Sequence, residues 1–353
     1  MTKPAVILDP HWRTMAELFS QGTLLALQEE FDVIWGRDEP ISSDAFDAAW
    51  PSASAWISAT PTVTRKMLGG ARKLRAVIEV SGAFPDTIDY KACAARGVEV
   101  LSCAPGFRES VAEMGLAMAL AGARGLVTEH EAFRSGNEGW LQENPATDFS
   151  LHGTRIGFVG FGQIARELTG LLAPFRPGVR AHDPWLAQED VSQFDVELCS
   201  LEDLLKWSRC LFVTAAPTSR NRAIISEDLL ALLPDHALVV LLSRAHLVDF
   251  DALVAAAMTG RIRVAADVFP VEPLPQDHPV RQVSNVILSP HRAAAVQGGR
   301  HLIGDMILTD LKAMCAGDSS RQLATSDSGR VELVAGVGNA ARATGRTVKG
   351  ADP

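Results

Sequence analysis

The stretch TRIGFVGFGQIARELTGLL, residues 154–172, decides the fold of this chain. A strand-like apolar run ends at Gly160, and the pattern G-x-G-x-x-A, made by Gly160, Gly162 and Ala165, leads into an amphipathic helix. Gly160 would permit a tight turn, Gly162 would let the backbone approach a pyrophosphate, and Ala165 would let the helix pack closely on the strand. The first N–H groups of that helix would bind phosphate oxygens. The stretch therefore predicts a dinucleotide-binding turn.

The strand that follows this helix supports the same interpretation. The run VRAHD, residues 179–183, ends in Asp183, about twenty residues after the turn, where a dinucleotide fold places its ribose-binding acid. A carboxylate there accepts a hydrogen bond from a ribose 2′-hydroxyl and repels a 2′-phosphate. Pro184 and Trp185 follow without an adjacent arginine, so the pattern favours NAD over NADP. The alternative is a turn that only packs tightly, with Asp183 capping its strand.

Strand–helix alternation extends from this stretch in both directions. The further strand-like runs are 5–9, 31–35, 54–59, 74–80 and 98–103 before it, and 210–216, 237–243, 263–269 and 285–289 after it. Such alternation predicts an α/β protein with doubly wound parallel sheets covered on both faces. A helical pattern over 295–317 closes the set. The tail from about Asp318 has weak periodicity, and we expect it to be irregular.

Composition limits the classes of partner. The chain has 353 residues, 47% of them hydrophobic and 21% charged, which suits two domains. Its net charge is −9 without a Lys/Arg-rich cluster, which argues against nucleic acid and acidic membranes as partners. The five cysteines are scattered, without a CxxC pair, so we expect no disulfide framework, no metal site and a reducing cytoplasm.

The stretch 104–126 contains an unusual helical pattern. Ser110 and Glu113 match a capping box, which predicts that a helix begins at Ser110. The helix is rich in Ala, Gly and Met, but Glu113 and Arg124 make it too polar to span a bilayer. Its small residues would permit close approach of another helix. It could cross between domains, pack on a second subunit, or simply be buried.

Polar residues with complementary chemistry follow three of the later strands. They are Arg244 in SRAHLVD, Asp267 and Glu272 in DVFPVEP, and His291 in SPHRAAA. Ligands of open α/β sheets bind beyond the carboxyl ends of the strands, so these side chains should face the dinucleotide cleft. An imidazole can move a proton near neutral pH, a carboxylate can orient it, and an arginine can bind a carboxylate bidentately. Together they indicate a 2-hydroxy-acid or 2-oxo-acid site.

Each of these residues also has a simpler interpretation. Arg244 could form a surface ion pair, Glu272 could be a loop residue before a proline, and His291 could lie at a strand end without a catalytic role. Their joint occurrence after a dinucleotide turn favours the catalytic interpretation.

The sequence resembles the D-isomer-specific 2-hydroxy-acid dehydrogenase family from about residue 50 to 318. The segments SVAEMGLAMAL, GFVGFGQIA, SRAHLVD, DVFPVEP and SPH carry the resemblance. It implies that His291 is the acid/base, Glu272 its orienting partner, Arg244 the substrate anchor, and Asp267 a ligand of the nicotinamide carboxamide. The NAD-binding residues would be Gly160, Gly162, Gln163, Ile164, Asp183, Ala215, Pro217, Ser243 and Asp267.

The resemblance also implies a domain organisation and an assembly. A Rossmann-type NAD-binding domain, 104–295, would be inserted in a flavodoxin-like substrate domain made of 1–103 and about 296–353. The loop SGAFPD would bind the substrate carboxylate through backbone N–H groups near Gly82 and Ala83. The family's members are usually homodimers through the helix at 110–120.

Several positions depart from the family pattern. Phe107 and Arg108 stand where an Asn is common, Leu241 replaces an Asn, Ala245 replaces a Gly, and Arg292 replaces an apolar residue. We hypothesise that Arg108 and Arg292 line the cleft and favour a substrate with a second anionic group. The alternative is that both point to solvent, or that Arg108 pairs with Glu109.

The sequence as a whole predicts a cytoplasmic, NAD-dependent enzyme acting on a small anionic 2-hydroxy or 2-oxo acid. Two alternatives remain open. One is an NADP-linked glyoxylate or hydroxypyruvate reductase, which Asp183 opposes. The other is a dinucleotide-sensing, corepressor-like binding protein, for which we see no basic patch. Formate oxidation is disfavoured, because that branch of the family has Gln where this chain has Glu272.

Overall fold

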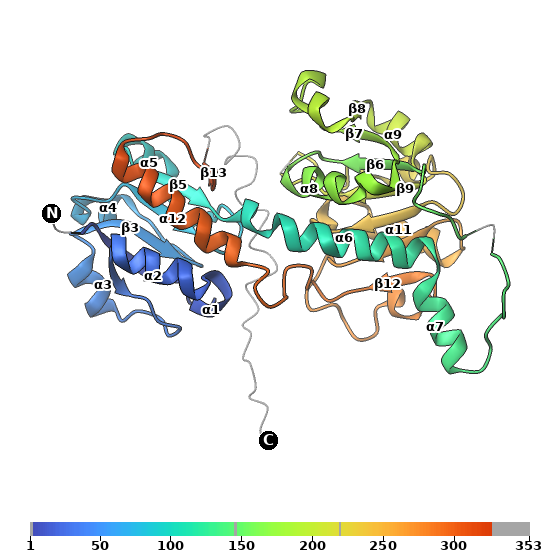
Figure 1. Ribbon diagram of the computed structural model, residues 1–353, viewed down its shortest axis with the longest axis horizontal. Coiled ribbons are helices and arrows are strands. Elements are labelled where there is room, and N and C mark those ends of the chain that lie inside the picture. The colour runs from blue at the N-terminus through green and yellow to red at the C-terminus, as the bar shows by residue number, and fades with distance from the viewer. Residues whose placement is uncertain (1–2, 145–146, 219, 327–353) are drawn as a thin grey trace.

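The computed structural model describes residues 3–144, 147–218 and 220–326. Its strands form two sheets, each covered by helices, and these make two lobes joined by the long helix α6 (Figure 1). We call them the first lobe, which holds the N-terminal strands, and the second lobe. The chain returns to the first lobe after the second is complete, so the first lobe is assembled from both ends of the described chain.

The sheet of the first lobe has the order β13-β5-β4-β3-β1-β2. Strands β1 to β5 are parallel and follow the flavodoxin-like order 2-1-3-4-5. Their bounds are β1 Ala5–Asp9, β2 Asp32–Trp35, β3 Ala53–Ser58, β4 Ala76–Glu79, β5 Glu99–Ser102 and β13 Ala324–Thr325. The predicted runs 31–35, 74–80 and 98–103 extend one or two residues beyond their strands at one or both ends, 54–59 is shifted by one residue, and 5–9 matches β1.

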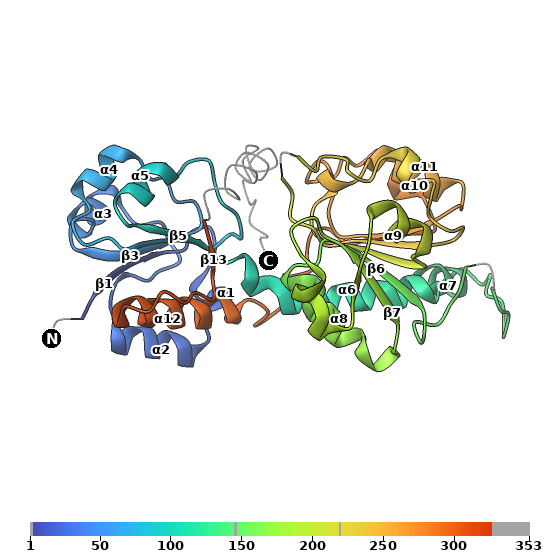
Figure 2. The same ribbon diagram turned by 90° about the horizontal axis from the view of Figure 1, so that it is seen from above.

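Helices cover both faces of this first sheet (Figure 2). Helix α12 (His301–Ala316) lies beside α2 (Gln21–Glu30) and α1 (Met15–Leu18) on one face. Helices α3 (Ser43–Ala49), α4 (Arg65–Gly70) and α5 (Tyr90–Ala95) cover the other. Two separate hydrophobic clusters result, one on each face, as expected for a parallel sheet buried on both sides.

The second sheet has the order β12-β11-β10-β9-β6-β7-β8, and its strand pairs are parallel. The first strand lies centrally, with β7 and β8 on one side and β9 to β12 on the other, which is the Rossmann order. The bounds are β6 Arg155–Val159, β7 Gly178–His182, β8 Glu197–Leu198, β9 Cys210–Val213, β10 Leu238–Leu241, β11 Arg263–Ala266 and β12 Val286–Leu288. The predicted fold class, a Rossmann-type sheet with a flavodoxin-like sheet, is confirmed.

The helices of the second lobe also form two layers (Figure 2). One layer holds α6 (Arg108–Ala123), α7 (Leu126–Arg134) and α8 (Gln163–Leu172). The other holds α9 (Leu201–Trp207), α10 (Glu227–Leu230) and α11 (Phe250–Met258). Short 3₁₀ turns lie at η1 Ala104–Phe107, η2 Ala173–Phe175, η3 Gln188–Phe194, η4 Ala245–Leu247 and η5 Pro279–Gln282.

The predicted start of α6 at a Ser110 capping box is wrong. The 3₁₀ turn η1 runs directly into α6, which therefore begins at Arg108, and Phe107 at the cap provides no side-chain hydrogen bond. The Ser110 hydroxyl instead donates to the Gly299 carbonyl at 2.7 Å. This contact joins the two polypeptide connections between the lobes.

The small residues of α6 pack against other elements of the second lobe. A Cβ on Gly115 would lie 2.7 Å from a methyl group of Leu242, and one on Gly122 would lie 2.7 Å from Leu238. The glycines therefore let α6 lie directly on the sheet and on α8. The sequence left open whether this helix crosses between domains, packs on a second subunit or is simply buried. For the face that carries Gly115 and Gly122, burial against the sheet is the explanation.

The prediction of an irregular tail from Asp318 holds for residues 318–323 and is wrong for Ala324–Thr325, which form a strand. Strand β13 pairs antiparallel with β5. The buried Asp310 carboxylate accepts the N–H groups of Gln322 and Leu323 at 2.8 and 2.9 Å, and Arg321 pairs with Glu99 at 2.6 Å. The rest of that prediction, 327–353, lies outside the described residues.

Candidate active site

The glycine turn has the geometry that the sequence predicts. Gly160 directly follows β6 and has a φ of +85°, which favours glycine. A Cβ on it would lie 2.3 Å from the Ala215 Cα, so the segment after β9 leaves no room for a side chain. The Thr214 hydroxyl donates to the Gly160 carbonyl at 2.7 Å. The turn is therefore fixed by its neighbouring strand.

The opposite side of the turn is open. Gly162 is the N-cap of α8, and apart from Gly162 and its two chain neighbours no heavy atom of the described residues lies within 4 Å of a Cβ built on it. Gln163 is exposed and Ile164 is half-buried at the start of the helix, whereas Ala165 is buried against the sheet. Space in front of a helix N-terminus is suited to an anionic group such as a pyrophosphate.

Asp183 lies beside this turn at the end of β7. Its carboxylate accepts the Phe161 N–H at 2.9 Å and the Trp185 N–H at 3.0 Å. The residue thus acts as the cap that the alternative interpretation describes. It is only half-buried, and a carboxylate has about four acceptor positions, so a ribose hydroxyl can still bind to it.

The other predicted cofactor residues lie along the same edge of the sheet. Ala215 and Pro217 follow β9 and are half-buried, and Ala215 contacts the glycine turn. Ser243 follows β10 and is buried, with its hydroxyl donating to the Val213 carbonyl at 3.2 Å. Asp267, after β11, is completely buried.

The structure brings together the three residues with predicted catalytic roles. His291 Nδ1 lies 2.6 Å from Glu272 Oε2, and the other oxygen of Glu272 accepts the Phe269 N–H at 3.0 Å. Because Nδ1 faces the carboxylate, Nε2 is the nitrogen left for a substrate. The His291 side chain is 43% exposed, so the ring is accessible.

Charges around Glu272 favour its ionised form. Burial alone would raise the pKa of this carboxyl, but the hydrogen bond from His291, the Phe269 N–H and the charges of His291 and Arg244 hold it below its ordinary value. Arg244 is half-buried and donates from Nη1 to its neighbour's carbonyl at 2.7 Å. A cation, an imidazole and an ionised carboxylate thus share one edge of the second sheet.

The predicted carboxylate loop of the first lobe is already occupied by the protein itself. The N–H groups of Gly82 and Ala83 both donate to Glu79 Oε2 at 2.8 Å, and the Ser81 N–H donates to Oε1 at 2.6 Å. In this structure these N–H groups are therefore not available as hydrogen-bond donors to a substrate. The Ser81 and Ser102 hydroxyls complete the cage around Glu79.

Glu79 was missed by sequence reasoning. It is 1% exposed, and burial raises the pKa of its carboxyl, against the effect of the hydrogen bonds from Ser81, Ala83 and Gly82. The available signal was an acid at the end of an otherwise apolar strand, LRAVIEV. A buried acid at that position requires several donors.

The two arginines of the anion hypothesis have different environments. Arg108 lies 3.7 Å from Glu167 and 3.9 Å from Glu109, so it forms ion pairs on α6 and α8 rather than presenting a free cation. This is the alternative considered from the sequence. Arg292 is exposed and directly follows His291, so only this arginine of the two remains suited to an anionic substrate group.

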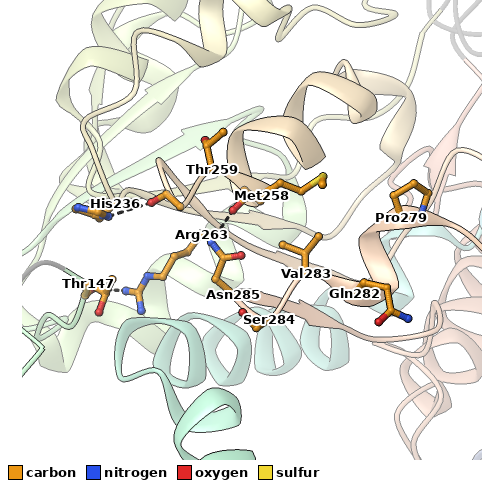
Figure 3. A pocket seen from close by; sticks show the side chains of 12 residues that line it. Thr147, His236, Met258, Thr259, Arg263, Pro279, Gln282, Val283, Ser284 and Asn285 are labelled. Atoms are coloured by element: carbon orange, nitrogen blue, oxygen red, sulfur yellow. Dashed lines mark hydrogen bonds between the residues drawn. The ribbon is translucent and has the colours of Figure 1, made fainter.

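A pocket of about 560 Å³ lies at the opposite edge of the second sheet (Figure 3). It is lined by the end of α11, the residues before β12, and Arg263 at the start of β11. Arg244, Glu272 and His291 follow the carboxyl ends of the strands, whereas this pocket lies at their amino ends. It is therefore separate from the site around His291.

Within residues 3–144, 147–218 and 220–326, no three His, Cys, Asp or Glu side chains are grouped as metal ligands. No single helix in those ranges is long and apolar enough to cross a membrane, although the bent pair Ala104–Ala123 and Leu126–Arg134 meets the length and composition criteria together.

Comparison with known proteins gives a consistent result. Residues 116–293 match the model for the D-isomer specific 2-hydroxyacid dehydrogenase, NAD binding domain. A D-3-phosphoglycerate dehydrogenase of Mycobacterium leprae is 30% identical over 90% of this chain and 59% of its own length. A glyoxylate reductase of Aeropyrum pernix is 30% identical over 85% of this chain and 91% of its own length.

A solved structure agrees. The crystal structure of a phosphoglycerate oxidoreductase from Rhizobium etli has a TM-score of 0.82 and 35% identity, covering 92% of this chain and 99% of that one. The chain spans about three fifths of the length of the first curated relatives that it matches.

Proposed function

This chain belongs to the D-isomer-specific 2-hydroxyacid dehydrogenase family, and we propose that it interconverts a 2-oxo acid and a 2-hydroxy acid with NAD(H). The observation that carries the proposal is the 2.6 Å contact between His291 and Glu272, at the same sheet edge as Arg244 and the open glycine turn. These groups provide a proton carrier, its orienting acid and a carboxylate anchor.

The residues would divide the reaction between them. NADH, when bound, would supply the hydride for reduction at C2 of the substrate. His291 gives a proton from Nε2 to the carbonyl oxygen, and Glu272 stabilises the resulting change in charge through Nδ1. Arg244 holds the substrate carboxylate and polarises the carbonyl. In oxidation, His291 accepts the proton.

The cofactor would lie across the glycine turn. The open side of Gly162 at the start of α8, next to Gln163 and Ile164, would hold its pyrophosphate. Asp183 would accept a hydrogen bond from the ribose and disfavour the extra phosphate of NADP. Ala215, Pro217 and Ser243 would border the rest of the cofactor.

The substrate would bind between the lobes. We propose a substrate domain of residues 1–103 and about 296–353 around a cofactor domain of residues 104–295. Arg244 is the main anchor for a small 2-oxo acid, and Arg292 would select for a second anionic group. Two relatives are named for activities on 3-phosphoglycerate and on glyoxylate, and both compounds are small anionic acids.

We further propose a homodimer through α6 and α7. Exposed apolar side chains lie on these helices and in the segment after α7: Leu120, Leu126, Val127 and Phe133 on the helices, and Trp140 and Leu141 after them. A groove of about 420 Å³ on α6 and α7 includes Leu120, Leu126, Arg124 and Glu129. Large apolar surfaces of this kind are typical of subunit interfaces. Leu126→Asp should convert a dimer to a monomer in gel filtration, while Leu25→Asp, at an exposed leucine of α2, should not.

The free thiols support a proposal for the cellular setting. Cys93, Cys103, Cys199, Cys210 and Cys315 are free, which suits a reducing compartment, and we propose the cytoplasm.

One assay tests the proposed function. Oxidation of NADH or NADPH is followed with a panel of 2-oxo acids, including members with a second anionic group. We expect turnover with NADH, and loss of most turnover with retained NADH binding in His291→Ala. Tight NADH binding without turnover on any member would favour a dinucleotide-sensing binding protein. A preference for NADPH would refute the role of Asp183.

A further inference from the structure

Glu79 is a buried acid at the end of a central strand of the first lobe. It is the last residue of β4 and lies between Ser58 of β3 and Ser102 of β5. The residue is 1% exposed, so its carboxylate is not accessible to a ligand. Burial of a carboxylate costs free energy unless several donors compensate it, and the identity of these donors indicates what the acid does.

Three successive N–H groups of the loop after β4 donate to this carboxylate. The Ser81 N–H donates to Oε1 at 2.6 Å, and the N–H groups of Gly82 and Ala83 donate to Oε2 at 2.8 Å. The Ser81 hydroxyl donates to Oε1 as well. Gly82 has a φ of +88°, which glycine adopts without strain. The carboxylate therefore fixes the path of the chain through residues 81–83.

Tyr90 holds the other end of the same loop. Its hydroxyl donates to the Pro85 carbonyl at 2.7 Å, and its ring meets the Phe84 ring edge-on with the centroids 6.5 Å apart. Tyr90 is the first residue of α5, so this contact attaches the loop to a helix. The loop is therefore held on both sides of the Phe84 N–H group.

The loop lies at the junction of the two lobes. A Cβ built on Gly82 would lie 2.7 Å from the Phe107 ring, so this ring rests directly on the loop. Phe107 packs against hydrophobic clusters of both lobes and immediately precedes α6, which runs into the second lobe (Figure 1). The loop also follows the carboxyl end of β4. A substrate bound between the lobes would therefore meet it.

One donor of the loop is left for a ligand. Among the described residues, the Phe84 N–H has no hydrogen-bond partner, although the three N–H groups before it are all bound. The next residue, Pro85, has no N–H group. Phe84 is only half-buried, so a ligand can approach the loop here. A backbone N–H donor makes a strong hydrogen bond to an ionised oxygen.

We propose that Glu79 is a positioning residue of the substrate site, which together with Tyr90 holds the loop 81–85 so that the Phe84 N–H binds the substrate carboxylate alongside Arg244. The inference rests on the proposed function. A donor that is fixed before the substrate arrives loses little freedom on binding, and this raises affinity. Because Glu79 touches neither the substrate nor the cofactor, its effect falls on substrate affinity and not on NADH binding or proton transfer.

The test compares Glu79→Ala and Glu79→Gln with the wild type in the oxidation of NADH by a 2-oxo acid. We expect the KM for the 2-oxo acid to rise about 10- to 100-fold in Glu79→Ala, the effect of losing one hydrogen bond to a charged group. The rise should be smaller in Glu79→Gln, because the amide oxygen can still accept from Gly82 and Ala83. The kcat and the Kd for NADH should remain those of the wild type, since a contact made equally in the ground and transition states changes only KM.

Asp310→Ala is the matched control. Asp310 is also a 1% exposed acid of the first lobe that accepts two successive N–H groups, those of Gln322 and Leu323, which lie outside the loop. This variant should lower the Tm, as the Glu79 variants do, and keep the wild-type KM. A rise in KM shared by Asp310→Ala would show that loss of stability alone causes it, and would overturn the proposal.

Two other outcomes also decide against the positioning role. One is an unchanged KM in a folded Glu79→Ala protein, and the other is a lower kcat at an unchanged KM. If neither Glu79 variant folds, Tyr90→Phe decides, because it removes the bond to Pro85 and keeps the ring contact with Phe84. A several-fold higher KM at unchanged kcat would then support the proposal, and an unchanged KM would overturn it.

The wild type and His291→Ala separate this inference from the proposed function. If the wild type reduces no 2-oxo acid, the proposed function and the positioning role fail together. If the wild type is active, His291→Ala is inactive and the Glu79 variants keep the wild-type KM, the proposed function stands and only the positioning role fails.

Discussion

Glu272→Gln is the substitution that most directly tests the catalytic pair. Gln keeps the size and shape of the side chain, and its carbonyl oxygen can still accept from His291 Nδ1. It removes the negative charge that lies 2.6 Å from the ring. The change therefore isolates the electrostatic contribution of Glu272 from its role in orienting the histidine.

The size of the effect follows from the environment of the pair. A hydrogen bond to a charged group contributes about 1.5–3 kcal/mol. The lower half of that range applies, because the His291 side chain is 43% exposed and that of Glu272 is 26% exposed, so water screens the charges. A loss of about 1.5–2 kcal/mol corresponds to a roughly 10- to 30-fold decrease in kcat.

The assay is steady-state oxidation of NADH with the best 2-oxo acid of the panel. Glu202→Gln is the matched control, because Glu202 is an exposed glutamate on α9 that forms an ion pair with Lys206, away from His291. We expect the control to keep wild-type kcat and both variants to keep the wild-type Kd for NADH. A kcat for Glu272→Gln within 2-fold of the wild type would refute the electrostatic role of Glu272.

The same pair predicts a pH dependence. Because the folded protein holds the pKa of Glu272 below its ordinary value, the pair contributes stability above that ordinary value and loses it as pH falls through the lowered one. The wild type should therefore lose more stability than Glu272→Gln on acidification in this window. Equal losses in thermal unfolding measured across it would contradict the assignment.

Three other predictions concern the turn, the ribose acid and the C-terminal strand. Gly160→Ala should lower the free energy of unfolding by about 2 kcal/mol or more, because its Cβ would lie 2.3 Å from the Ala215 Cα, whereas Gly162→Ala should keep the Tm and weaken NADH binding. Asp183→Ala should reduce the preference for NADH over NADPH in kcat/KM, and an unchanged ratio would exclude Asp183 from ribose selection. Arg321→Ala should lower stability by about 1 kcal/mol in denaturant unfolding, since it removes the contact with Glu99; no change would show that β13 is held by other bonds.

The sequence by itself determined the fold class and the composition of the proposed catalytic group. Apolar runs separated by helical patterns predict parallel strands, and the order of Gly160, Arg244, Glu272 and His291 along the chain places each after a strand. In a parallel sheet the carboxyl ends of the strands share one edge, so local patterns are enough to predict that these groups meet.

The partners of individual polar groups were decided only by the tertiary structure. The N–H groups of Gly82 and Ala83 bind Glu79, and Arg108 pairs with Glu167. Neither choice can be read from periodicity, because a hydrogen-bond partner depends on side-chain rotamers and on which competing donors and acceptors are buried nearby.

Contacts between distant segments explain the remaining differences. Asp267 meets residues 289–293 only because β11 and β12 are neighbours, and Ala324–Thr325 form a strand only because Asp310, Glu99 and β5 provide partners for the segment 318–326. A short strand with weak local periodicity has little stability of its own. It forms where long-range hydrogen bonds and burial offset the entropy of ordering it, and only the folded chain supplies those.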